Sequence, residues 1–199
     1  MLLLYFLLAG VVIGLARGGR LSDLTRTRFA WWPVALGGLL FQVLLFSVPL
    51  GSVVGDSGPA LYVASTLAVL AALVRNLTLP GFALIAVGAS LNLLAIVTNG
   101  GQMPADPSAV MALFGEARIP TDIFSNSVVA GSSAAFPFLG DTMVLPRPLP
   151  FANVFSIGDV LIGLGGASFL VRSMGRRHQS GSRPGLAQVS RDRDRSLSG

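Results

Sequence analysis

Two aspartates stand where an acid and a base could act together. Asp159 lies inside the apolar stretch 154–171, where a carboxylate is costly unless it has a partner or a function. Asp141 follows Gly140 shortly before that stretch. Two carboxylates that meet can share a proton, because the negative charge of one raises the pKa of the other. The pair can then activate water. Asp141 and Asp159 are therefore the candidate catalytic dyad of an aspartyl-type membrane peptidase.

Each aspartate also has a structural interpretation. Ser156 and Asp159 have the spacing of a capping box, in which the acid accepts a hydrogen bond from the serine amide at a helix start. Asp141, directly after a glycine, has the composition of an ordinary turn. The sequence leaves the structural and the chemical alternative open for both residues.

Uncharged polar residues inside the apolar stretches predict a second kind of site. Gln42, Ser65, Thr66 and Asn92 would lie at mid-depth or in the outer half of a bilayer. They either line one outward-facing polar pocket or form hydrogen bonds between helices. The candidate binding residues of this outer polar pocket are Gln42, Asn92, Asn99, Arg118 and Arg147.

Composition excludes several kinds of chemistry. The chain has no cysteine and one histidine, His178, which stands in a polar tail. Disulfides, thiolate nucleophiles, multi-histidine metal sites and a Ser-His-Asp triad are therefore excluded. The stretch Asn99–Pro104 is rich in glycine but lacks the lysine and the spacing of a phosphate-binding loop. We expect no metal and no cofactor.

The chain is too apolar for the surface of a water-soluble domain. Of its 199 residues, 52% are hydrophobic and 12% charged, against roughly 25% charged in soluble domains. The surplus of apolar side chains predicts contact with lipid. We expect an all-α integral membrane protein with a membrane domain over 1–174 and a disordered, arginine-rich tail over 175–199. The predicted transmembrane helices are 1–16, 31–50, 60–74, 80–98 and 154–171.

The arginines predict the orientation of these helices. All 14 basic residues are arginines, and all but Arg118 and Arg147 fall on one side of the membrane if the five helices alternate in direction. Positively charged loops stay in the cytoplasm, so we expect the amino terminus outside and the tail inside. This bias explains the net charge of +5 without nucleic acid. The expected partners are the lipid bilayer and, at the tail, anionic lipid.

The segment 99–153 between the fourth and fifth predicted helices is expected outside. It holds seven prolines and no apolar run long enough to cross a bilayer. An apolar stripe within 107–116 predicts a short helix along the membrane interface. The part 121–139 is expected either to re-enter the membrane or to lie on its outer surface.

Three motifs carry a resemblance to a known family. They are Asn99-Gly100-Gly101 with Met103-Pro104, then Leu139-Gly140-Asp141, then Ser156-Ile157-Gly158-Asp159. With them the chain resembles a family of small bacterial multi-pass membrane proteins of unknown function. The resemblance implies a location in the bacterial cytoplasmic membrane and no particular activity.

The last predicted helix also resembles that of the lipoprotein signal peptidases, which enters behind an Asn-x-Ala-Asp element. Here Asp159 stands at the position of its aspartate and Asp141 at that of its partner, but the Asn, the Ala and the Gly-Asn-x-x-Asp-Arg stretch are absent. We therefore expect a structural, accessory or small-ligand-binding membrane protein. The alternatives are an aspartate-dyad peptidase and an ion or small-solute conduit that uses Asp159, Asn92 and Gln42.

Overall fold

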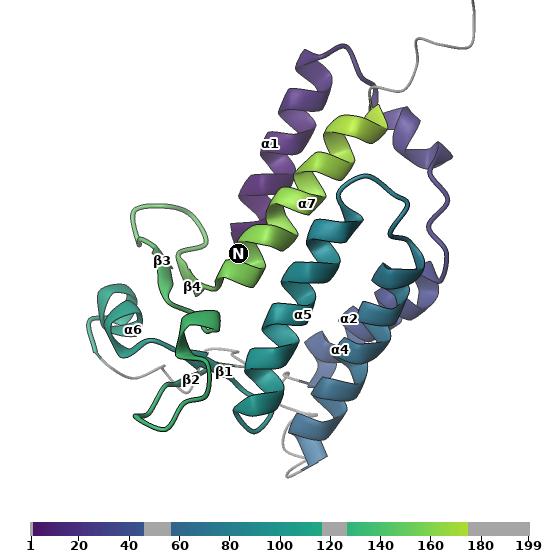
Figure 1. The fold of residues 1–199 in the computed structure, drawn as a ribbon. Helices are drawn as coiled ribbons and strands as arrows, with labels where there is room; N and C mark the ends of the chain where they lie inside the picture. Colours follow the sequence, from purple (N-terminus) through teal and green to yellow (C-terminus); the bar gives the residue numbers. More distant parts are fainter. Residues whose placement is uncertain (1, 46–56, 117–126, 175–199) are drawn as a thin grey trace, which may run out of the picture.

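Five long helices form the body of the protein. The computed structural model describes residues 2–45, 57–116 and 127–174. The long helices are α1 (Leu2–Ala16), α2 (Trp32–Leu45), α4 (Gly58–Arg75), α5 (Phe82–Thr98) and α7 (Ile157–Met174), shown in Figure 1. They coincide within a few residues with the five apolar stretches of the sequence, except that α2 is described only as far as Leu45. The mostly helical fold is thereby confirmed.

The long helices stand in a row whose order differs from the order of the chain. Helix α1 packs on α7, α7 on α5, α5 on α4 and α4 on α2. Consequently α1 and α2, which are neighbours in the sequence, lie at opposite ends of the row (Figure 1). The last helix fills the place between α1 and α5 and joins the two parts of the body.

The two ends of the helix row differ in composition. One end carries the arginines of loop 17–28, which includes the 3-10 helix η1 (Leu21–Arg26), as well as Arg75 and Arg172 in the last turns of α4 and α7. We call this the arginine end. The described residues of 99–155 gather at the other end, where α7 begins, and we call them the cap (Figure 1). The described arginines that the sequence assigned to one side of the membrane, in 17–28 and at positions 75 and 172, thus lie together at one end of the helix row.

Glycines allow α5 and α7 to approach closely. A Cβ atom built on Gly88 would lie 2.4 Å from the carbonyl oxygen of Gly158, and one built on Gly81 would lie 2.1 Å from that of Gly165. Each pair is separated from the other by seven residues, or about two turns, on both helices. Small residues at this spacing bring the two backbones into contact, as helices in lipid commonly require.

The cap contains four short strands in two small sheets. Strands β1 (Met103–Ala105) and β2 (Ser127–Val129) pair in parallel, with Pro104 opposite Val128. Strands β3 (Met143–Leu145) and β4 (Asn153–Phe155) pair antiparallel, with Val144 opposite Val154. The expectation of an exclusively helical protein is therefore wrong for the cap, because its prolines interrupt helices while its short apolar runs can still pair as strands.

The short helix predicted in the cap is present and packs one side in the core of the cap. Helix α6 (Pro107–Phe114) is capped by the Asp106 carboxylate, which accepts from the amides of Ser108 and Ala109. Its apolar side, including the fully buried Val110, packs in the core of the cap against β3 and β4. Its other side is exposed and includes Met111, so its position along a membrane interface stays a prediction.

The described part of 121–139 also belongs to the cap. It forms β2 and, further on, the 3-10 turn η3 (Pro137–Leu139). Residues 121–126 lie outside the described residues, as do the tail 175–199 and Arg118.

Two of the described helices, α4 and α7, are long and apolar enough to cross a bilayer. A core helix of a soluble protein passes the same test, but such a helix is mostly buried. Only 11% of the α4 residues and 28% of the α7 residues are buried here. Helices α1, α2 and α5 are apolar but shorter, so the five-span topology stays a prediction.

Candidate functional site

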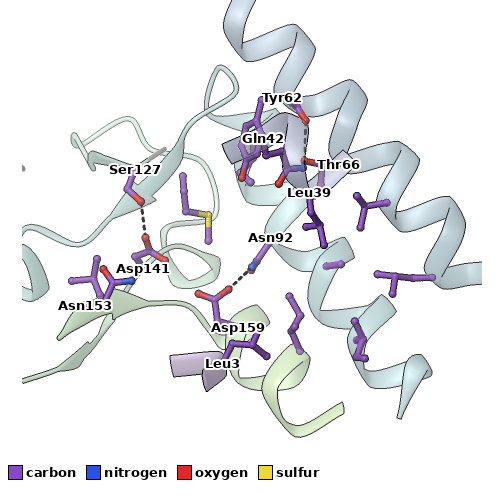
Figure 2. Close-up of a pocket in the computed structure, with 18 of the residues that line it drawn as sticks. Leu3, Leu39, Gln42, Tyr62, Thr66, Asn92, Ser127, Asp141, Asn153 and Asp159 are labelled. Carbon is purple, nitrogen blue, oxygen red and sulfur yellow. Dashed lines mark hydrogen bonds between the residues drawn. The ribbon is translucent and has the colours of Figure 1, made fainter. Parts of the chain in front are cut away.

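A cavity of about 450 Å³ lies where the cap meets the five long helices. Polar side chains line it on the cap side, with Ser127, Asp141 and Asn153, and on the side of α2 and α4, with Gln42, Tyr62 and Thr66 (Figure 2). Most of its remaining walls are apolar. The polar lining residues are Gln42, Tyr62, Thr66, Asn92, Ser127, Asp141, Asn153 and Asp159. Both aspartates singled out from the sequence therefore face one space, together with two of the five candidate binding residues.

Asp159 is held by a closed network at the start of α7. Its Oδ2 accepts from the Ser156 amide at 3.0 Å, and its own amide donates to Ser156 Oγ at 3.1 Å. This is the reciprocal pair of a capping box, so the predicted helix cap is confirmed. Asn92 closes the network from α5. Its Nδ2 donates to Asp159 Oδ1 at 2.8 Å (Figure 2), and its Oδ1 accepts from Ser156 Oγ at 2.8 Å.

Close packing of the backbones makes the contact between Asn92 and Asp159 possible. A Cβ atom built on Gly158 would lie 1.9 Å from Asn92 Oδ1, so only glycine leaves room for that amide. Ser156 is fully buried. The network therefore fixes the register of α7 against α5 as well as the direction of the Asp159 carboxylate.

Asp141 is positioned by the backbone of the cap. Its amide donates to the Pro104 carbonyl oxygen at 2.9 Å, and its carbonyl oxygen accepts from the Asp106 amide at 3.0 Å. A Cβ atom on Gly140 would lie 2.1 Å from the Pro104 oxygen, so the preceding glycine permits this pairing. The turn interpretation is thus too simple, because Asp141 forms a parallel bridge beside β1.

The Asp141 side chain is buried and faces the cavity. It is 6% exposed, and its Oδ2 accepts from Ser127 Oγ at 2.9 Å (Figure 2). Desolvation by burial raises the pKa of the Asp141 carboxyl to about 6; the Ser127 hydrogen bond acts against this rise, and the negative charge of Asp159 adds to it. Asp141 can therefore gain or lose a proton near neutral pH.

A third polar group lies on the α2 side of the cavity. Gln42 Nε2 donates to Ser65 Oγ at 3.2 Å and to Thr66 Oγ1 at 3.1 Å, and both hydroxyls donate to the Tyr62 carbonyl oxygen. These are hydrogen bonds between α2 and α4. Gln42 and Thr66 also line the cavity. Both alternatives from the sequence therefore apply, because these residues line a pocket and also form hydrogen bonds between helices.

Two other candidate residues have different roles. The Asn99 side chain donates to the Ala135 carbonyl oxygen and accepts from its amide, both at 2.9 Å, and so ties the end of α5 to the cap. Arg147 is exposed and donates to the Phe114 carbonyl oxygen at 3.3 Å. Neither is among the residues that line the cavity.

Within the described part of the chain, the site has acidic and amide groups but no basic residue in its lining. No group of three or more His, Asp or Glu side chains is placed there to hold a metal ion. The chemistry that the described residues offer is hydrogen bonding, attraction of positive charge and proton exchange.

A family model matches residues 26–171, and its description is a family of unknown function, DUF5317. The chain belongs to this family. The resemblance seen in the sequence is thereby confirmed over most of the chain. No curated protein and no solved structure matches the chain.

The three motifs on which the resemblance in the sequence was based meet in space. Met103 and Asp141, from the first and second motifs, line the cavity with Asp159 from the third. The first two motifs also pair through the hydrogen bond that the Asp141 amide donates to the Pro104 carbonyl oxygen. A family name without an activity leaves the function to be argued from this geometry.

Sequence reasoning missed several lining residues. Ser127 and Asn153 stand in irregular stretches with no motif around them, and they reach the cavity only through strand pairing. Tyr62 had a usable signal, because it precedes Thr66 by four residues and so shares its helix face.

Proposed function

We propose that this DUF5317 protein is an integral membrane protein whose cavity binds a small, positively charged ligand at the outer face. The cavity at the junction of cap and helices is the observation that supports ligand binding. Its volume falls in the range of about 300–1,000 Å³ that is usual for small-molecule sites.

The exposure of apolar side chains supports the membrane location. Leu8, Val43 and Leu67, on three different helices, are 61%, 61% and 50% exposed, and similar side chains cover the outer surfaces of the row. Monomeric soluble proteins rarely expose apolar patches of this extent. In a bilayer the same side chains face lipid and need no further partner.

The arginine end supports the orientation. Arginines avoid crossing the membrane, which favours the arginine end in the cytoplasm and the cap outside. With this orientation the cavity lies near the outer surface, where a solute from outside reaches it first.

The arrangement of the carboxylates supports binding of a cation. Two acids and no described base line the cavity, so a negative potential is expected inside it. The apolar walls towards the arginine end argue against the conduit alternative, because an ion path needs polar groups along its whole length.

Charge-selective modification of a cysteine tests this proposal. The chain has no native cysteine, so Asn153→Cys places a single thiol in the cavity. We expect a cationic methanethiosulfonate to react there at least about tenfold faster than an anionic one of similar size. Thr142→Cys, exposed on the cap surface, is the matched control and should show little preference. An equal preference at both positions would refute a cation-binding cavity.

An aspartate-dyad peptidase is the second candidate, because the Asp159 charge contributes to the raised pKa of Asp141. Asp141 would then donate the proton and Asp159 would act as base. Comparison of protein amino termini in membranes that contain the wild type or Asp141→Asn tests this directly. Cleavage products found only with the wild type would favour the peptidase, and identical sets of termini would exclude it.

A further inference from the structure

The cavity is elongated and changes character along its length. On α4 it is lined by Tyr62, Thr66, Val69 and Leu73, the first and last of which are eleven positions apart. With a rise of 1.5 Å per residue this corresponds to about 16 Å along the helix. The residues nearest the cap are polar, and those nearest the arginine end are apolar.

A similar change appears on the other helices. On α5 the lining begins beside the cap with the apolar Ile96 and continues through Asn92 to Ala89 and then Ile85, so the polar Asn92 lies on the cap side of two apolar residues. On α7 it runs from Asp159 to Ile162. A small hydrophilic cation would fill only the polar part and leave an apolar groove of about one to two helix turns behind it.

The groove is open on the side between the two ends of the helix row. Leu3 of α1 and Leu39 of α2 both line the cavity, and yet they are 41% and 50% exposed. Helices α1 and α2 lie at opposite ends of the row (Figure 1), and the main packing partner of α2 is α4. An opening flanked by leucines at this depth would face the acyl chains of a bilayer.

From this geometry we infer that the ligand is a single-chain amphiphile with an amine-bearing head, which enters from the bilayer between α1 and α2. This inference rests on the proposed function and names the class of ligand. The head lies between Asp141 and Asp159, where the ammonium donates to both carboxylates. The chain lies in the groove between α4 and α5, against Val69, Ile85 and Ala89.

Both parts of such a ligand match the lining. An ammonium group in this polar part donates charge-assisted hydrogen bonds, which are about twice as strong as neutral ones. A carboxylate or phosphate head of the same size would meet two negative charges and no described base. Specificity therefore comes from repulsion of anionic lipids as much as from attraction of the amine.

Photolabelling in lipid nanodiscs tests the inference. The probes are diazirine derivatives of dodecylamine, dodecanol and dodecanoic acid, each at the same mole fraction of lipid. We expect the amine to label the α4 and α5 groove at least tenfold more than the acid, with the labelled residues identified by mass spectrometry. Asp141→Asn combined with Asp159→Asn should reduce the amine labelling to the level of the alcohol. Equal labelling by all three probes would mean ordinary lipid contact and would overturn the inference.

A pair of matched variants tests the position of the chain. Ala89→Phe fills the groove, whereas Val87→Phe adds the same side chain two residues away on the exposed surface of α5. We expect the first to abolish labelling of the groove and the second to leave it unchanged. Undiminished labelling in Ala89→Phe would place the chain elsewhere and overturn the inference.

Competition on the wild type needs no variant and separates the inference from the proposed function. Soluble butylamine should protect the groove from the dodecylamine probe much less than unlabelled dodecylamine does. Equal protection would show a site for soluble amines, which would refute the amphiphile and leave the cation-binding cavity intact. Loss of charge preference at Asn153→Cys would instead refute the cavity itself.

Discussion

Replacement of Asp141 by Asn should stabilise the protein, and by more at neutral than at acidic pH. Burial raises the pKa of Asp141 from its usual 3.8 to about 6, which means that the folded protein holds this proton more tightly than the unfolded chain does. A raised pKa contributes stability that is fully present below 3.8 and is lost as the pH rises through 6. Above that range the ionised side chain burdens the fold, and asparagine removes the burden while it keeps an acceptor for Ser127.

The size of the effect follows from the two pKa values. Because a tenfold change in an equilibrium corresponds to 1.36 kcal/mol, the charged carboxylate costs about 3 kcal/mol at about pH 7.5. At about pH 4.5 the cost falls to about 1 kcal/mol. For a protein of this size, 3 kcal/mol corresponds to an increase in Tm of roughly 6–12 °C.

Thermal unfolding in detergent micelles, followed by circular dichroism, measures this difference. The quantity that matters is the gap in Tm between Asp141→Asn and the wild type at the two pH values. Asp106→Asn is the control. Hydrogen bonds from Ser108 and Ala109 lower the pKa of Asp106, so its negative charge stabilises the fold. Removal of this charge should therefore bring no gain in Tm at neutral pH. A gap for Asp141→Asn that is the same at both pH values, or a loss of stability at neutral pH, would refute the reasoning.

Two further substitutions test the packing and the cap of α7 by the same unfolding assay. Gly88→Ala should destabilise the protein by about 2–3 kcal/mol, because its Cβ would meet the Gly158 carbonyl oxygen at 2.4 Å. Gly37→Ala is the control, since nothing lies within 4 Å of its Cβ, and it should stabilise the protein by up to about 1 kcal/mol. Equal effects of the two would contradict the close approach of α5 and α7. Ser156→Ala should cost about 0.5–2 kcal/mol through loss of the cap, and a neutral result would mean that the hydroxyl is dispensable.

The local features of the site could be predicted from the sequence, and the contacts between distant segments could not. The capping box of Ser156 and Asp159 involves two residues three positions apart, so its spacing alone was sufficient. The hydrogen bond from Asn92 to Asp159 joins residues 67 positions apart and depends on the contact of two glycine-bearing backbones. The sequence made Asp141 and Asp159 a candidate dyad because of their residue types, but no local pattern required that they line one cavity.

The cap shows a second limit of sequence reasoning. Its strands have three residues each, which is too short for the alternation that identifies a strand. Asn99 was a candidate residue of the outer polar pocket. Its side-chain amide is instead hydrogen-bonded to Ala135, in a loop that returns to the end of the helix. No local sequence pattern predicts this return.

The central claim is that the arginine end and the cap lie on opposite sides of a membrane. Because the chain lacks cysteine, Ser22→Cys in η1 and Thr142→Cys in the cap each introduce one exposed thiol. A membrane-impermeant maleimide applied to intact cells with a permeable outer envelope should label Thr142→Cys at once and Ser22→Cys only after the membrane is opened. Equal labelling of both thiols in intact cells would contradict the membrane topology and, with it, the outer cavity.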